Sequence, residues 1–136
     1  MSDARKTREN IPSGGKWEPL VGYSRAVRAG DWVHVAGTTA ADPSGRVIGE
    51  GDPYRQTVEA LRAVGEALAR AGATMADVVR TRMFVTDISR WEEFGRAHGE
   101  FFQTIRPAAT RVEVARLIDP AMMIEIEVDA FSPRPR

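Results

Sequence analysis

Charged residues alternate with apolar residues in two segments of the last third of the chain. The charged positions are Arg111 and Glu113 in the first segment and Glu125, Glu127 and Asp129 in the second. An alternation with a period of two predicts strands with one apolar face and one charged face. If the two strands pair as an antiparallel hairpin, the register that buries both apolar sets brings all the charges together. Where neighbouring chains exclude water, such a cluster has perturbed pKa values and suits acid–base chemistry, whereas in water it is simply the outer face of a sheet.

Three further side chains could take part in chemistry, namely Tyr23, His34 and His98. Tyr23 stands just before the first expected strand, where its hydroxyl could orient a ligand or its ring could pack on the sheet edge. The two histidines are far apart in the sequence, so we expect no metal site, and we expect His98 to be solvated on the flank of a helix. The sequence contains no phosphate-binding glycine loop and no zinc-protease or serine-hydrolase motif.

The composition excludes several classes of protein. A length of 136 residues predicts one domain, and the lack of cysteine excludes disulfides, thiolate metal sites and cysteine nucleophiles. The 19 basic and 19 acidic residues balance, so the net charge favours neither nucleic acid nor an anionic membrane as a partner. No apolar run is long enough to span a membrane and the N-terminus lacks the apolar core of a signal peptide, so we expect a cytoplasmic protein.

The N-terminal part of the chain divides into an arm and a hairpin. Residues 1–22 are polar and show no period, which predicts an extended arm with Trp17 as its anchor. We expect this arm to precede a single domain over residues 23–136. Two strands over residues 23–29 and 32–38 are separated by a glycine and an aspartate, which predicts a two-residue hairpin turn.

Caps and apolar spacing predict two helices. Asp52 caps a helix over residues 53–71, in which apolar residues recur at helical spacing. A strand over residues 79–85 follows, and a capping box that begins at Ser89 starts a second helix that runs to about Gln103.

The expected order is therefore β-β-α-β-α-β-β. Two helical crossovers predict an α+β fold, with a mixed sheet and both helices on one face. The other face then carries Trp32, His34 and the charged sets, a mixture that suits a subunit interface better than bulk water.

Several segments match one known family when they are taken together. They are YS at 23–24, GDWVHVAG at 30–37, the helix at 53–71, VVRTRMFVTD at 78–87, RPAATRVEVARL at 106–117 and IEIEVDAF at 124–131. Over residues 20–131 the chain resembles the reactive-intermediate deaminase family, known as RidA or YjgF. The resemblance implies a chorismate-mutase-like homotrimer, in which the sheets surround a barrel-like core and three ligand clefts lie between subunits. It also implies hydrolysis of reactive enamines and imines, such as 2-aminoacrylate, to 2-keto acids and ammonia, without a metal or an organic cofactor.

The chain departs from the family pattern at three positions. The arginine that binds the substrate carboxylate in the family corresponds to Ala109 here, which argues against 2-aminoacrylate as the substrate. A small hydroxyl residue before the glycine of the second strand is Ala36, and an asparagine on the second helix is Gly95.

Other family positions are retained. The resemblance implies that Glu125 positions or activates the attacking water, that Tyr23 of the next subunit closes the cleft, and that backbone amides near Gly37 or Arg111 hold the carboxylate. The residues expected around the substrate are Ala36, Gly37, Ala109, Thr110 and Glu113.

Two roles for Arg111 remain open. It lies on the same strand face as Ala109, so its guanidinium could lean back and hold a carboxylate. It could equally form an ion pair with Glu127 or Glu113.

The alternatives to a deaminase-type hydrolase come from other classes. One is a trimer that binds a small carboxylate without turnover, as a sensor or buffer. A ribonuclease is disfavoured by the neutral charge and the lack of a paired histidine acid and base. An arginine-rich cleft of the chorismate-mutase kind would draw on Arg82, Arg111 and Arg116.

Overall fold

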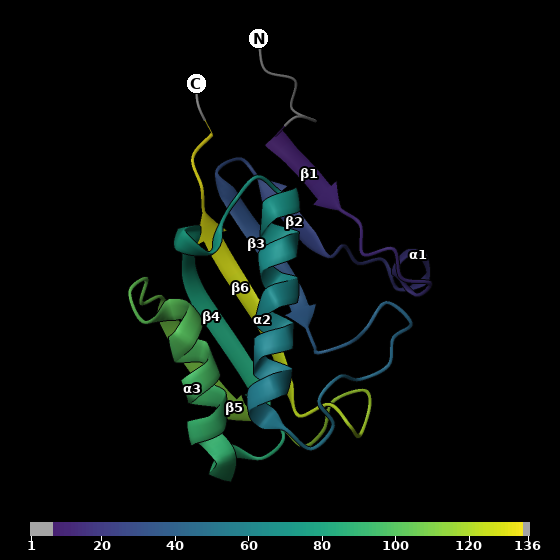
Figure 1. Ribbon diagram of the computed structural model, residues 1–136. Helices are drawn as coiled ribbons and strands as arrows, with labels where there is room; N and C mark the ends of the chain where they lie inside the picture. Colours follow the sequence, from purple (N-terminus) through teal and green to yellow (C-terminus); the bar gives the residue numbers. More distant parts are fainter. Residues whose placement is uncertain (1–6, 135–136) are drawn as a thin grey trace.

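The computed structural model describes residues 7–134, and Figure 1 shows two long helices lying across one face of a single sheet. The strands are β1 (Arg8–Ile11), β2 (Ala26–Ala29), β3 (Trp32–Thr38), β4 (Val78–Val85), β5 (Ala108–Glu113) and β6 (Ile124–Phe131). The helices are α1 (Glu18–Val21), α2 (Pro53–Arg70) and α3 (Trp91–Phe102), with 3-10 turns η2 (Met75–Asp77) and η3 (Ile88–Arg90). The predicted α+β class, with both long helices on one face of a mixed sheet, is confirmed.

The sheet has the strand order β1-β2-β3-β6-β4-β5, in which only β4 and β5 are parallel. The predicted hairpin of the last two strands is wrong. β6 lies in the middle of the sheet between β3 and β4, so both of its edges are already paired. β5 instead follows the α3 crossover and lies beside β4 at the edge of the sheet.

This topology separates the charges that the sequence pattern had placed together. Arg111 is paired with Met83 of β4, whose side chain is buried under the helices. Glu125 is paired with Phe84, the next residue of β4, and therefore points to the open face. Arg111 and Glu113 thus lie on the covered face, whereas Glu125, Glu127 and Asp129 lie on the open face.

The core forms between the helices and the covered face. On α2 the predicted positions Leu61, Val64 and Leu68 are fully buried, and on α3 so is Phe94. Each such side chain contributes roughly 1.5–3 kcal/mol by leaving water. Asp52 caps α2 as predicted, since its carboxylate accepts a hydrogen bond from the Arg55 N–H at 3.0 Å.

The start of α3 differs from the prediction. Asp87, not Ser89, supplies the capping carboxylate, and it accepts a hydrogen bond from the Ser89 N–H at 3.0 Å. This cap begins η3, and α3 follows from Trp91 without a side-chain cap of its own.

The segment expected to be an extended arm contains regular structure. Within the described part, β1 pairs antiparallel with β2, and α1 forms a single turn. The expectations for residues 1–6 lie outside the described residues. Trp17 does not anchor the arm by burial, because its side chain is 58% exposed.

The predicted β2–β3 hairpin is confirmed, with Gly30 in the turn at a φ of 61°.

Over residues 7–134, no helix combines the length and the apolar character needed to cross a membrane.

Candidate functional site

A bulge at the end of β3 opens a cavity on the uncovered face of the sheet. The register between β3 and β6 shifts between Val35 and Thr38, and the cavity beside this shift has a volume of about 640 Å³. Its polar side chains are Tyr23, Arg25 and Glu125, its backbone lining is Ala36 and Gly37, and its apolar walls are Trp17, Val21 and Ile118. We call this the Glu125 cavity.

The carboxylate of Glu125 lies directly against the backbone of Gly37. A methyl group on Gly37 would come within 2.7 Å of Oε2, so this position of the carboxylate requires a glycine. The side chain is half-buried, and burial raises the pKa of Glu125 above the usual carboxyl range. The positive charge of Arg25 opposes this rise in pKa, and the negative charge of Glu127 adds to it.

Tyr23 and Arg25 flank the carboxylate. The Tyr23 hydroxyl lies 3.3 Å from the hydroxyl oxygen of Ser13, so its ring stands between the N-terminal segment and the cavity. Arg25 donates a hydrogen bond from Nη2 to the carbonyl oxygen of Gly37. Burial lowers the pKa of Arg25, and the nearby Tyr23 and Glu125 oppose that change.

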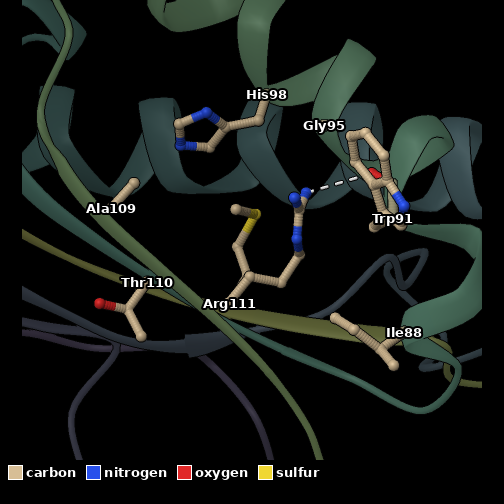
Figure 2. Close-up of a pocket in the computed structure, with 8 residues that line it drawn as sticks. Ile88, Trp91, Gly95, His98, Ala109, Thr110 and Arg111 are labelled. Carbon is tan, nitrogen blue, oxygen red and sulfur yellow. Dashed lines mark hydrogen bonds between the residues drawn. The ribbon is translucent and has the colours of Figure 1, made fainter.

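A second cavity, of about 450 Å³, lies between α3 and β5 on the covered side, and we call it the α3–β5 cavity (Figure 2). Arg111 reaches toward α3 and donates from Nη1 to the Trp91 carbonyl oxygen at 3.2 Å. A methyl group on Gly95 would lie 3.2 Å from the same Nη1, so the guanidinium uses the space that the glycine leaves. Ala109 and Thr110 also line this cavity.

His98 is half-buried and lines the α3–β5 cavity, rather than being a solvated residue on the helix flank as predicted. Its Nε2 lies 2.9 Å from the Thr81 hydroxyl, and its ring centroid lies 4.7 Å from that of Phe102. Burial, together with the charge of Arg111, lowers the pKa of His98 and favours the neutral ring.

His34 lies on the opposite, open face, with Nδ1 2.8 Å from Asp129. Within residues 7–134 no group of three or more histidine and carboxylate side chains could hold a metal ion.

Of the two roles left open for Arg111, the ion pair with Glu127 or Glu113 does not form within this chain. Glu127 instead accepts from Arg82 at 3.4 Å, and the same nitrogen of Arg82 contacts Asp129 at 3.1 Å. Glu113 accepts from the Ile88 N–H at 3.0 Å and so holds η3 in place. Arg82 and Arg111 lie on opposite faces of the sheet, so within one chain they do not form an arginine-rich cleft.

The structure therefore divides the predicted site residues between two places. Tyr23, Ala36, Gly37 and Glu125 come together in the Glu125 cavity, whereas Ala109, Thr110 and Arg111 belong to the α3–β5 cavity. Glu113 lines neither of them. Sequence reasoning missed Arg25, although a basic residue two positions after Tyr23 and next to buried Ala26 was a signal for a charge on the open face.

Comparison with known proteins places the chain in a family. Residues 15–132 match the sequence profile described as Endoribonuclease L-PSP. A crystal structure of a YjgF/YER057c/UK114 family member from Mycobacterium tuberculosis shares 51% sequence identity with this chain, covers 91% of it and 98% of its own chain, and has a TM-score of 0.83.

More distant relatives agree. A RutC family protein from Pyrococcus abyssi is 32% identical over 114 residues, which is 84% of this chain and 89% of that protein. A structure from the conserved Rid protein family of Yersinia pestis is 27% identical, covers 91% of this chain and 98% of its own, and has a TM-score of 0.79. From the profile match and these relatives, we conclude that this chain belongs to the RidA/YjgF family.

Proposed function

We propose that this protein is a cofactor-independent hydrolase, which adds water to the C=N carbon of a small reactive imine or enamine beside Glu125. The observation that carries the proposal is the half-buried Glu125 carboxylate, which is held against Gly37 in a cavity open to solvent. Among the described residues none donates a hydrogen bond to this carboxylate, so its oxygens are available to a water molecule.

Glu125 acts as the general base in this proposal. A base is most effective when its pKa is near the working pH, and burial moves the pKa of Glu125 in that direction. The carboxylate takes a proton from water while the water oxygen bonds to the protonated C=N carbon. The proton on Glu125 then moves to the nitrogen of the carbinolamine, the C–N bond breaks as the hydroxyl oxygen forms the C=O bond of the product, and ammonia leaves with the hydroxyl proton as ammonium. One water is consumed and one ammonia leaves, so no electrons are exchanged.

The complete site is an intersubunit cleft of a homotrimer. The two cavities lie on opposite faces of one chain, so a site that uses both sets of predicted residues needs two copies. The open face also carries exposed Trp32 and Phe131, whose rings lie 5.0 Å apart and suit burial in an interface. In this arrangement Ala109, Thr110 and Arg111 of one subunit approach Glu125 of the next.

The substrate differs from 2-aminoacrylate. The methyl group of Ala109 cannot bind a carboxylate, and Arg111 already donates to the Trp91 carbonyl oxygen. A small imine that differs in shape or in the position of its charge fits these residues better.

A trimer that only binds a small carboxylate is the second candidate. One feature favours it: Glu125 is the only carboxyl group among the residues that line its cavity, so no second carboxylic acid is present there to protonate the leaving group. A ribonuclease is disfavoured, because the two histidines lie on opposite faces and cannot act as a paired acid and base within one chain.

The test supplies imines generated in situ from a panel of amino acids by an amino-acid oxidase, with 2-aminoacrylate included, and measures the release of 2-keto acid. We expect Glu125→Gln to lower kcat by about a hundredfold or more, because a general base typically contributes 10²–10⁴. Glu127→Gln is the matched control, since it removes a carboxylate from the same strand and face, and it should keep most of the activity. Ala109→Arg should gain activity toward 2-aminoacrylate.

The outcomes separate the candidates. If Glu125→Gln turns over every imine at the wild-type rate, Glu125 is not the general base and the proposed mechanism fails. If the wild-type protein binds 2-keto acids but accelerates hydrolysis of none of the imines, the binding trimer replaces it.

A further inference from the structure

The side chain of Arg25 is built into the Glu125 cavity by two strands. Its backbone N–H donates to the Ile11 carbonyl oxygen at 2.8 Å, and its carbonyl oxygen accepts from the Ala36 N–H at 3.0 Å. These bonds fix the residue between β1 and β3, just before β2. The guanidinium then reaches the bulge, where it donates to Gly37, the same residue against which Glu125 lies.

Most of the hydrogen-bonding capacity of the Arg25 guanidinium is not used by the fold. A guanidinium has five N–H donors, and the single bond found for this one is to the Gly37 carbonyl oxygen. Its Nε is enclosed, yet it has no hydrogen-bond partner among residues 7–134. A buried charged donor without an acceptor is unfavourable, so an acceptor entering the cavity would improve the environment of this side chain.

Two other arginines provide the contrast. Arg28, three residues later, is 3% exposed and donates to four backbone carbonyl oxygens, which marks it as a structural residue. Arg82 is neutralised by Glu127 and Asp129. Arg25 forms no ion pair within 4.0 Å with any described residue, and it is the only cation among the residues that line the Glu125 cavity.

The chemistry of the cavity selects the type of anion. A planar guanidinium matches the planar fork of a carboxylate. The nearby Glu125 carboxylate repels a second negative charge, so a monoanion is favoured over a dianion such as phosphate. The apolar walls, Trp17, Val21 and Ile118, suit a short hydrocarbon body rather than a second charged group.

We propose that Arg25 binds the carboxylate of the ligand in the Glu125 cavity, and so fulfils the role that the sequence pattern had left to Arg111. This inference rests on the proposed function for one point only, namely that the ligand binds in the Glu125 cavity. The carboxylate contacts Arg25, the carbon that reacts faces Glu125, and the hydrocarbon body packs against Trp17 and Ile118. Arg25 then selects small monocarboxylates.

The experiment measures binding of pyruvate and of methyl pyruvate, which has the same shape without the charge, by ligand-observed NMR. Arg25→Gln keeps an amide N–H for the Gly37 carbonyl oxygen but removes the charge. We expect it to weaken pyruvate binding by about tenfold or more, which is the loss of one charge-assisted hydrogen bond. The affinity for methyl pyruvate should be unchanged, and inorganic phosphate should not displace pyruvate.

Two further variants keep the test decisive. Arg62→Gln is the control and should bind pyruvate as the wild type does, because Arg62 is an exposed arginine of α2 that pairs with Glu59 at 3.1 Å, away from the Glu125 cavity. Arg25→Lys should recover part of the affinity. Thermal unfolding of each variant verifies that the fold is intact. The assignment to Arg25 is overturned if Arg25→Gln binds pyruvate normally, if Arg62→Gln loses as much affinity, or if the wild type binds methyl pyruvate as tightly as pyruvate.

A failure of the proposed function is a separate result. Loss of pyruvate binding in Arg25→Gln, together with full turnover by Glu125→Gln, would support the role of Arg25 and reject the general base.

Discussion

The two faces of the sheet differ in how they satisfy their polar side chains. Under the helices, Gln56 is fully buried, and its amide bonds to the carbonyl oxygens of Gly49 and Ala121 and to the N–H of Met123. Arg28 likewise donates to four backbone carbonyl oxygens. On the open face, by contrast, Glu125 accepts no hydrogen bond from residues 7–134, and Nε of Arg25 lacks a partner there.

This difference separates stability from function. A polar group whose hydrogen bonds are all made inside the fold contributes to folding, and its removal leaves the partner atoms unsatisfied. A partly buried group whose bonds are not made inside the fold destabilises it, and is retained where a ligand uses it. Gln56 and Arg28 on the covered face are of the first kind, and Arg25 and Glu125 in the Glu125 cavity are of the second.

The largest expected effect is the loss of Arg28. Its guanidinium holds the carbonyl oxygens of Ala71 and Gly72 after α2, that of Gly30 in the hairpin turn and that of Ser132 after β6. Arg28→Met leaves the buried Ala71 carbonyl oxygen without this donor and removes three part-buried hydrogen bonds, so we expect it to lower the free energy of unfolding by about 3 kcal/mol. Arg25→Met should lower it by less than about 1 kcal/mol.

Urea unfolding of both variants, at one protein concentration, measures this difference. Equal losses would contradict the distinction between the two faces.

A second prediction concerns Gly37 and moves the carboxylate without removing it. Gly37→Ala brings a methyl group within 2.7 Å of Oε2, so the Glu125 side chain must shift. Because a displacement of about 1 Å at a reacting group costs up to a hundredfold, we expect kcat to fall by about tenfold to a hundredfold. The measurement is the imine hydrolysis assay.

The control for this prediction is Gly99→Ala on α3, where a methyl group would meet nothing within 4 Å. That change should leave kcat unaltered and stabilise the helix by up to about 1 kcal/mol. An unchanged kcat in Gly37→Ala would mean that the position of the Glu125 carboxylate does not matter for turnover.

Local features of the sequence were enough to predict much of the covered side. The Asp52 cap and the spacing of Leu61, Val64 and Leu68 are local signals, and they placed α2 correctly. The β2–β3 hairpin followed from its turn residues in the same way. Such signals act within a few residues, so they do not depend on the rest of the fold.

The site was harder to predict because its geometry is nonlocal. A period of two revealed that Arg111 and Glu125 each point away from the apolar side of their strands, but it did not reveal which face each strand presents to the helices. The pairing of Arg111 with buried Met83 of β4 places it beside α3 on the covered side, while the buried residues of β6 leave Glu125 on the open side. The importance of Arg25 likewise depends on the bulge at Gly37, which no pattern around residue 25 indicates.

The smallest expected effect is on the pH dependence, and it tests the open face directly. Burial raises the pKa of Glu125, so kcat/KM should increase with pH through a midpoint above the usual carboxyl range. The positive charge of Arg25 lowers this pKa, so Arg25→Gln should move the midpoint to higher pH. Glu127→Gln should move it to lower pH, because it removes a negative charge that raises the pKa.

The raised pKa of Glu125 also predicts a pH dependence of stability, and its direction is opposite to that of kcat/KM. Because the folded pKa lies above the unfolded value, the folded state binds more protons between the two values, and stability falls as the pH rises through the folded pKa. Glu125→Gln should therefore be more stable than the wild type above that pKa, while below the unfolded pKa this advantage disappears. Thermal unfolding of both proteins from about pH 3 to about pH 8 measures the difference. If Glu125→Gln is less stable than the wild type at neutral pH, the Glu125 carboxylate stabilises the fold, as Gln56 and Arg28 do on the covered face.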